Sequence, residues 1–371
     1  MAKKLLLAGG GHAHMMVLAS LRKFRDLGHL VTVIQPSPHH YYSGMGPGML
    51  GQTYQPEEIR FATRQVVEKQ GCAFILDKVA RVEPAANRVI LESGAAVAYD
   101  VVSFNIGSNV SGHIPVEKSE TIFPVKPIER LQEAQQLILR LGAGKPLNVG
   151  IVGGGPSAVE IAGNIWGLAQ KNGLQPVTIT IFARTSIMKG FPDGVRSLAI
   201  NSLNRRKIQI IEHCSVSKIE KDRIEIDSRQ IYGLDVIFVA VGVRPSHVFR
   251  KSGMAIGPEG GLVVNRYLQS IDYPNVFGGG DCIYFQDSPL DKVGVYAVRE
   301  NPVLLHNLMA ALEGKEMREF DPGGEYLLIF NLGDGTGIFR KKRLLFNGRL
   351  AFFLKDSIDR RFMKKFQALE R

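Results

Sequence analysis

The sequence contains few cysteines and no close pair of them. Cys72, Cys214 and Cys282 are the three cysteines among 371 residues, and no C-x-x-C motif occurs. This spacing excludes a disulfide scaffold and a cysteine-based metal site. It fits the reducing cytoplasm, where we expect the protein to be.

The sequence also lacks a long apolar run. A membrane-spanning helix needs about 20 consecutive apolar residues, and no segment approaches that length. Met1–Leu7 resembles the start of a signal peptide, but the apolar run stops at Gly9–Gly11 and no cleavage-like site follows. We therefore predict that these residues form a first strand and that the chain does not cross a membrane.

Acidic residues are too few to balance the basic ones. The chain has 46 Lys and Arg against 35 Asp and Glu, which gives a formal net charge of +11. Such an excess favours anionic partners, namely dinucleotides, acidic phospholipids or nucleic acid. No recognition helix, zinc finger or aromatic RNA motif is present. We therefore expect no nucleic acid partner.

Length and periodicity predict two similar units and an appendage. With 371 residues and 45% hydrophobic content, the chain can bury more than one core. An apolar strand over 3–8, a glycine turn, a helix over 13–24 and a strand over 30–34 form one unit. The same order recurs from Leu147 to Phe182. The sequence therefore predicts two βαβ dinucleotide-binding units.

The first glycine turn, Gly9 to His14, has the composition of a phosphate-binding loop. A pyrophosphate must approach the backbone at a helix start, where free N–H groups and the helix dipole stabilise its charge and a side chain would block it. Gly9 and Gly11 fill the first two positions of G-x-G-x-x-G, whereas His14 occupies the third. Gln35 stands where a ribose-binding acid is usual. A plain strand-to-helix connection is the alternative for this turn alone.

The second glycine turn matches the pattern better. Gly153, Gly155 and Ala158 fit the G-x-G-x-x-A form. At the end of the strand over 177–182, Ala183 and Arg184 replace the carboxylate that usually holds both ribose hydroxyls of NADH. Arg184 can pair with a 2′-phosphate, so we place NADPH ahead of NADH. A solvated arginine is the alternative.

A third segment completes the pattern. Asn275 to Cys282 places Asp281 directly after a strand and a run of glycines. Together with the two turns and Phe238–Pro245, this segment resembles the flavin-binding signature of the pyridine nucleotide–disulfide oxidoreductase superfamily, and the resemblance covers nearly the whole chain. It implies that Asp281 binds the ribityl chain of FAD and that the second turn binds NAD(P)H.

The resemblance also implies an α/β fold of two Rossmann-like, three-layer domains. The FAD domain is split between 1–118 and 247–320, and the NAD(P)H domain spans 119–246. A small region over 321–371 follows, with β structure from Glu325 to Leu354, a hairpin turn at Asn347–Gly348, and a basic amphipathic helix over 356–369.

The lack of a cysteine pair narrows the branch. Dithiol chemistry is disfavoured because no two cysteines lie close together. Sulfide oxidation is disfavoured because Cys72 and Cys214 do not lie in the segments where sulfide:quinone reductases have their cysteines. Cys282 is expected to be a buried packing residue. The rest resembles type II NADH dehydrogenases. Tyr42–Gly48, Gly294–Arg299 and Leu354–Met363 resemble most the flavoprotein module fused to selenide, water dikinase.

The resemblance implies that a hydride passes from NAD(P)H to FAD and that electrons then pass to an acceptor, for which a quinone is the candidate. The helix beginning near Val295 would direct its positive end at the flavin. Arg299 and Glu300 on that helix and Lys126 are candidate catalytic residues, although type II NADH dehydrogenases tend to have glutamines in this helix near the quinone. A surface lysine between two prolines is the alternative for Lys126.

These arguments give one set of cofactor-binding candidates. They are Gly9, Gly11, His12, Ala13, His14, Gln35, Ser43, Gly44, Pro47, Gly107, Lys126, Gly153, Gly155, Pro156, Ser157, Glu160, Arg184, Gly242, Gly280, Asp281, Val295 and Tyr296.

The histidines do not form a recognisable metal site. His12, His14, His39 and His40 have no carboxylate or cysteine at ligand spacing, so we predict no metal. We expect His14 to pack near the flavin pyrophosphate. We expect His39 to Tyr42 to form part of a loop over the flavin.

The C-terminal helix suggests a partner surface. Ile358, Phe362, Phe366 and Leu369 recur at helical spacing and are flanked by basic residues. Such a helix suits the surface of an anionic membrane, which would make the protein peripheral on the inner face of the cell membrane. Packing of this stripe on the protein itself or on a second subunit, as in a homodimer, is the alternative.

Two functions therefore stay open. One is an FAD-dependent NAD(P)H dehydrogenase that lacks a redox-active disulfide. The other is an FAD-binding protein with weak NAD(P)H turnover that acts as an electron-transfer or regulatory partner of a selenium or sulfur enzyme.

Overall fold

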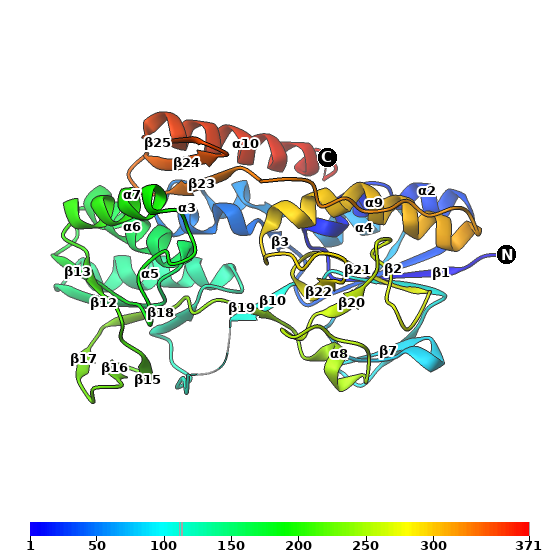
Figure 1. Cartoon of the computed structure of the whole chain (residues 1–371). Coiled ribbons are helices and arrows are strands. Elements are labelled where there is room, and N and C mark those ends of the chain that lie inside the picture. Colours follow the sequence, from blue (N-terminus) through cyan, green and yellow to red (C-terminus); the bar gives the residue numbers. More distant parts are fainter. Residues whose placement is uncertain (111, 113, 371) are drawn as a thin grey trace.

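Two parallel sheets of five strands each form the body of the computed structural model, which describes residues 1–110, 112 and 114–370 (Figure 1). The first sheet has the order β21 (Val276–Gly278), β9 (Val101–Phe104), β1 (Lys4–Ala8), β2 (Leu30–Gln35), β5 (Ala73–Leu76). The second has the order β11 (Ile122–Pro124), β18 (Val236–Val239), β12 (Leu147–Val152), β13 (Val177–Phe182), β14 (Gln209–Ile211). The expected α/β fold with two Rossmann-like units is confirmed.

The central strands are apolar because both of their faces are covered. Leu5, Leu6 and Leu7 are each at most 1% exposed, as expected for a parallel sheet between helical layers. The helices of the first domain are α1 (Met15–Leu18), α2 (Leu21–Asp26), α4 (Thr63–Lys69), α8 (Val248–Lys251) and α9 (Gly294–Glu313). Those of the second are α5 (Glu129–Gly142), α6 (Pro156–Lys171) and α7 (Asp193–Arg205), and α3 (Gly46–Leu50), from the first-domain loop, packs against α5 and α6.

Small sheets of two or three strands, most of them antiparallel, lie around these two sheets. In the first domain they are β6 (Val79–Glu83), β7 (Arg88–Leu91) and β8 (Ala96–Ala98), with β3 (His40–Tyr41) on β4 (Arg60–Phe61) and β20 (Leu262–Val264) parallel to β22 (Ile283–Phe285). In the second they are β15 (Val216–Glu220), β16 (Arg223–Ile226) and β17 (Ile231–Gly233). The pair β10 (Ser108–Val110) and β19 (Val243–Pro245) joins the two domains.

The chain ends in a sheet that lies on the second domain and a helix that extends from it to the first domain (Figure 1). The sheet consists of β23 (Leu328–Asn331), β24 (Gly337–Lys341) and β25 (Leu344–Gly348), and the helix is α10 (Arg349–Gln367). Met363 belongs to the core of the second domain, Phe366 belongs to that of the first, and Phe362 packs against both. The helix α10 therefore ties the two cores together.

The predicted boundaries of this region were wrong in two places. The helix begins at Arg349 and not at 356. The prediction failed because the continuous apolar run Leu350–Leu354 fits a buried strand and a buried helix equally well by pattern alone. The hairpin turn lies at Lys342–Arg343, where Lys342 has a φ of 53°, and not at Asn347–Gly348. Gly348 does take a positive φ of 119°, but it uses it to leave β25 and begin α10.

Two further expectations, the helix over 13–24 and the apolar stripe of the C-terminal helix, need smaller corrections. The helix predicted over 13–24 is divided into η1 (His12–His14), α1 and α2, because Ser20 leaves helical geometry with a φ of −123°. On α10, Phe362 and Phe366 pack on the protein itself, which was the alternative to binding a membrane surface. Ile358 is 48% exposed. The predicted apolar stripe is therefore mostly an internal face.

Candidate functional site

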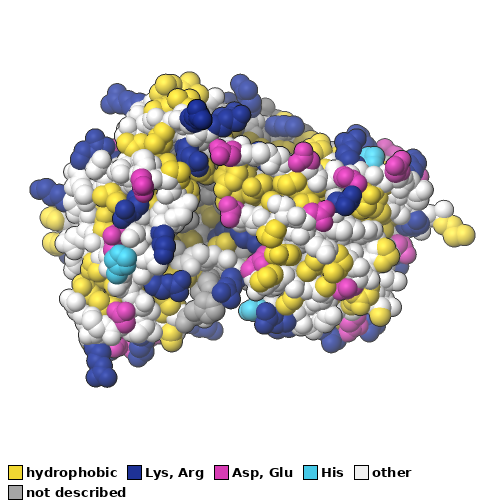
Figure 2. Space-filling view, in the orientation of Figure 1, with side chains coloured by type: hydrophobic (Ala, Val, Ile, Leu, Met, Phe, Trp, Pro, Cys, Tyr) yellow, Lys and Arg dark blue, Asp and Glu magenta, His cyan; other side chains and the backbone are white. Residues whose placement is uncertain are grey.

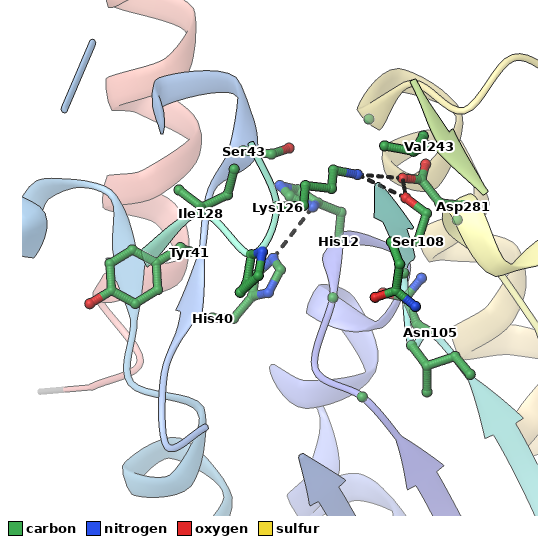
Figure 3. A pocket seen from close by; sticks show the side chains of 18 of the residues that line it. His12, His40, Tyr41, Ser43, Asn105, Ser108, Lys126, Ile128, Val243 and Asp281 are labelled. Atoms are coloured by element: carbon green, nitrogen blue, oxygen red, sulfur yellow. Dashed lines mark hydrogen bonds and ion pairs between the residues drawn. The ribbon is translucent and has the colours of Figure 1, made fainter. Parts of the chain in front are cut away.

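A cavity of about 710 Å³ lies between the two domains (Figure 3). The first glycine turn, the loop after β2 and the turn at Asp281 line it from the first domain. The start of α6 and the segment 125–131 line it from the second. One elongated molecule in this cavity would contact both domains.

The glycines of the first turn are required by the close approach of the end of β9. Gly9 has a φ of +88°, and a Cβ atom there would lie 2.2 Å from the carbonyl oxygen of Asn105. A Cβ atom at Gly11 would lie 1.9 Å from Asn105 Oδ1. Any side chain at either position would displace Asn105, so this turn presents bare backbone to the cavity.

Gln35 is part of the scaffold of that turn. Its Oε1 accepts a hydrogen bond of 3.0 Å from the N–H of Gly10. Its Nε2 donates to the carbonyl oxygens of Ser37 and His39. The amide therefore fixes the turn against the following loop and stays in the wall of the cavity.

Asp281 lines the cavity and forms an ion pair that joins the domains. Lys126 Nζ lies 2.7 Å from Asp281 Oδ2, and Ser108 Oγ donates to the same oxygen at 2.6 Å (Figure 3). Burial acts to raise the pKa of Asp281, but Lys126 and Ser108 outweigh it and hold the pKa below its usual value. Asp281 is therefore an anion, and Lys126 is not a free surface lysine.

Two glutamates with little exposure to solvent flank the cavity. Glu160 on α6 lines it, and its Oε1 accepts a 2.8 Å hydrogen bond from the N–H of Asn331. Glu300 lies behind the turn, where its Oε2 accepts a hydrogen bond from the N–H of Gly280. Burial raises the pKa of each to about 7. Arg299 reaches the carbonyl oxygens of Pro322 and Gly324 instead of the cavity.

A group of packed rings connects the lining of the cavity to α10. The ring of His12 lies 4.9 Å from that of His40, 5.0 Å from that of Tyr42 and 5.9 Å from that of Phe362, measured between centroids. His12 and His40 both line the cavity. The predicted loop from His39 to Tyr42 therefore does cover this site, and α10 supports it from behind.

A buried ion pair on α10 supports the same group of rings. Lys355 and Asp359 are 7% and 5% exposed, and their charged atoms lie 2.5 Å apart. Lys355 also donates to the carbonyl oxygen of Gly44, and Tyr42 donates its hydroxyl to Asp359 at 3.0 Å. The pair thus attaches α10 to the loop that lines the cavity.

The structure brings most of the sequence-derived candidates to one cavity. Those that line it are Gly9, Gly11, His12, Gln35, Ser43, Gly44, Pro47, Gly107, Lys126, Ser157, Glu160, Gly242, Gly280 and Asp281. Outside its lining are Ala13, His14, Gly153, Gly155, Pro156, Arg184, Val295 and Tyr296. Ala13 and His14 are fully buried. Arg184 is exposed at the end of β13.

His14 supports the first glycine turn from behind. Its Nδ1 bonds the carbonyl oxygen of Gly9 and its Nε2 bonds Ser103 Oγ, each at 2.7 Å. It therefore connects the turn to β9 from inside the core and does not reach the cavity.

Sequence reasoning missed several residues of the site. Asn105 and Ser108 follow β9, and a polar residue after an apolar strand is a signal that could have found them, since parallel strands end at one edge. Lys355 and Asp359 had no such signal. Their i, i+4 spacing is the same as that of exposed helical pairs.

The cavity fits FAD in shape and chemistry. The side-chain-free turn at Gly9 suits a pyrophosphate, Asp281 suits ribityl hydroxyls, and the volume of about 710 Å³ is of the size that a large cofactor needs. No cysteine lines it; Cys282 is buried, and burial raises its pKa to about 12. Within 1–110, 112 and 114–370, no three His, Cys, Asp or Glu side chains gather as metal ligands would.

Comparison with known proteins agrees with this geometry. Residues 3–308 match the family model described as pyridine nucleotide-disulphide oxidoreductase. A type II NADH:quinone oxidoreductase of Staphylococcus saprophyticus is 24% identical over 393 residues, covering 98% of this chain and 96% of the relative. Ferroptosis suppressor protein 1 of Xenopus laevis is 23% identical over 354 residues, covering 91% and 88%.

Solved structures show the same fold. The sulfide:quinone oxidoreductase of Aquifex aeolicus superposes with a TM-score of 0.80 at 20% identity, over 99% of this chain and 92% of that one. An engineered NADPH oxidase derived from the Lactobacillus brevis enzyme gives 0.74 at 18%, over 91% and 74%. In that variant, bound to NADPH, an aspartate is replaced by alanine and the alanine after it by arginine.

Proposed function

The chain belongs to the pyridine nucleotide-disulphide oxidoreductase family and is an FAD-dependent NAD(P)H dehydrogenase, for which we propose that NADPH is the donor and a quinone the acceptor. The observation that carries the proposal is the cavity itself. It joins the first glycine turn and Asp281 to Glu160 at the start of α6, with no cysteine in its lining. Bound there, FAD would take two electrons from the nicotinamide and pass them to the acceptor, with no redox-active disulfide in between.

The protein supplies position and electrostatics for this reaction. Lys126 and Ser108 keep Asp281 ionised for the hydroxyls of a ribityl chain. The N-terminus of α9 reaches the cavity at Gly294 and Ala297, where its positive end favours negative charge. Glu300 supports the Gly280 turn, so we assign it and Arg299 to structure and not to chemistry.

Anaerobic mixing of the purified protein with NADPH, and separately with NADH, tests the proposal. We expect rapid loss of flavin absorbance with NADPH and its return when a quinone is added. Bleaching with neither nucleotide would contradict the donor assignment and favour a flavin-binding partner of another enzyme.

The end of β13 supports NADPH as the donor. Ala183 is buried and Arg184 is exposed, so neither residue supplies the carboxylate that usually holds two ribose hydroxyls at this position. The replacement of an aspartate–alanine pair by alanine–arginine in the NADPH-bound oxidase runs parallel to Ala183–Arg184.

Replacing Arg184 by alanine should therefore weaken the binding of NADPH and leave that of NADH unchanged. We expect the KM for NADPH to rise roughly 10- to 100-fold, because a charge-assisted contact to the 2′-phosphate is lost, and the KM for NADH to stay within about twofold. Steady-state kinetics with both donors measures this. Arg205→Ala, also exposed on the second domain, is the matched control. An equal effect on both donors would refute this assignment.

An exposed apolar face on α10 supports contact with a membrane, the source of quinone. Leu350 and Phe353 are 61% and 64% exposed, and Leu344 of β25 and Ile358 are also exposed. Exposed basic residues surround them, namely Lys341, Lys342, Arg343, Arg349, Arg361, Lys364 and Lys365. Figure 2 shows this apolar surface at the top of the molecule with basic side chains around it. No helix among the described residues is long and apolar enough to span a membrane.

The double variant Leu350→Asp, Phe353→Asp should release the protein from membranes. An apolar face with a basic rim binds anionic lipid through both buried area and charge, so we expect sedimentation with phosphatidylglycerol vesicles to fall at least about tenfold. Leu76→Asp, an equally exposed leucine on β5, should bind like the wild type. Unchanged sedimentation of the double variant would argue against this face.

A further inference from the structure

Reduction of a quinone to a quinol takes up two electrons and two protons. NADPH gives up two electrons and one proton, so the balanced reaction is NADPH + H⁺ + quinone → NADP⁺ + quinol. One proton per turnover must therefore come from the solvent and reach the acceptor through the wall of the cavity.

His12 and His40 have the geometry of a proton relay. An imidazole ring carries a donor and an acceptor on opposite nitrogens, so it can take a proton at one and release a proton from the other. His12 Nδ1 lies 3.4 Å from His40 Nε2 (Figure 3). His12 Nε2 is buried near the rings of Tyr42 and Phe362 and has no hydrogen-bond partner. One nitrogen is thus engaged in the pair and the other is free.

Most of the neighbouring polar groups already have fixed partners. Lys126 and Asp281 are bound to each other, and the hydroxyl of Tyr42 is donated to Asp359. Glu160 lies on α6 and already accepts from the N–H of Asn331. His14, two residues away, uses both ring nitrogens inside the core. A buried imidazole nitrogen without a hydrogen-bond partner lowers the stability of the fold, so its presence points to a functional role.

The surroundings keep both rings neutral between turnovers. Burial lowers the pKa of His12 to about 4, with Asp281 raising it and Lys126 lowering it. Burial also holds the pKa of His40 well below its usual value. Neutral rings keep one N–H and one acceptor each, and negative charge developing on the acceptor during reduction would draw the proton from His12.

We propose that His12 donates the second proton to the reduced acceptor and that His40, positioned beside it, passes a proton on to His12. The proposal rests on the proposed function, because it presupposes an acceptor that takes up protons as well as electrons.

The variant His12→Phe separates electron transfer from proton delivery while it keeps a flat ring beside Tyr42 and Phe362. We expect quinone reduction to fall about 100-fold, within the range usual for a lost proton donor. Ferricyanide accepts electrons without protons, so the ratio of quinone to ferricyanide reduction per bound flavin should fall by about the same factor, whatever the variant does to flavin binding. Equal loss with both acceptors, or no loss with quinone, would overturn the proposal.

A spectroscopic readout is independent of turnover. In protein labelled with ¹⁵N-histidine, we expect His12 to be neutral at pH 7 and its tautomer populations to change in His40→Phe, whereas His306→Phe on α9, outside the cavity lining, leaves them unchanged. A charged His12, or one indifferent to His40→Phe, would contradict the relay. A wild type that reduces ferricyanide but no quinone would instead refute the proposed acceptor, and the labelled spectra would still decide whether the pair exists.

Discussion

Replacing Lys355 by methionine should lower the free energy of unfolding by about 3–5 kcal/mol, because it leaves the carboxylate of Asp359 buried without its cation. Asp359 is 5% exposed and would keep only the hydroxyl of Tyr42 as a partner. Urea denaturation followed by circular dichroism measures the loss. The double variant Lys355→Met, Asp359→Leu should recover most of it, since an apolar pair of similar volume replaces a buried ion pair at little cost.

The loss should also depend on pH in a defined direction. Burial already raises the pKa of Asp359 above its usual value, and Lys355 opposes that rise. Without Lys355 the folded-state pKa rises further above the unfolded one, so the contribution of Asp359 to the stability of Lys355→Met is fully present below about pH 4 and is lost as pH increases through the folded pKa.

An exposed pair with the same spacing provides the control. Arg64 and Glu68 on α4 form an i, i+4 ion pair of 2.8 Å, but each side chain is about half exposed. Arg64→Met should cost no more than about 0.5 kcal/mol, because solvent screens such pairs. Similar losses at the two sites would show that burial does not set the energy of the Lys355 pair.

Replacing Asp281 by alanine should yield a protein that is nearly free of flavin. Asp281 is ionised in the lining of the cavity, and Lys126 and Ser108 hold it in place. Losing a charged acceptor for ribityl hydroxyls should raise the Kd for FAD about 10- to 100-fold. Calorimetry with FAD and the flavin-to-protein absorbance ratio of the purified protein both measure this.

A nearby aspartate distinguishes this role from general damage. Asp287 is exposed after β22 and lies 3.8 Å from Arg266, so Asp287→Ala should retain FAD with wild-type affinity. A melting temperature of Asp281→Ala close to that of the wild type would show that the fold is intact. Full retention of FAD by a folded Asp281→Ala would remove Asp281 from the binding site.

Local pattern predicted the fold well where one physical cause dominated. The strands over 147–152 and 177–182 are found with those bounds, because a strand covered on both faces must be continuously apolar. The glycine turns were recognisable because only glycine tolerates the approach of Asn105 and Ala240 to Gly9 and Gly153. Leu350–Leu354 was misassigned because an apolar run has no period that separates strand from helix.

The candidate site was predictable only where its residues belong to such turns. Gly9, Gly280 and Asp281 lie in motifs that carry their own chemistry, and all three line the cavity. The Lys355–Asp359 pair and the group of rings formed by His12, Tyr42 and Phe362 depend on where α10 docks. That docking is decided by contacts between segments more than 300 residues apart, such as Tyr42 with Asp359, and no local pattern encodes it.

The position of β21 at the edge of the first sheet has a consequence for the order of folding. β21 pairs with β9, yet every strand of the second sheet lies between them in the chain. During synthesis the second domain can complete its own sheet while the first still lacks β21 and the Asp281 turn that follows it. Closing so long a loop is slow, because its entropy is lost before the pairing compensates for it. We therefore expect refolding in two phases, with the inserted domain first and the capacity to bind flavin appearing only in the slower one.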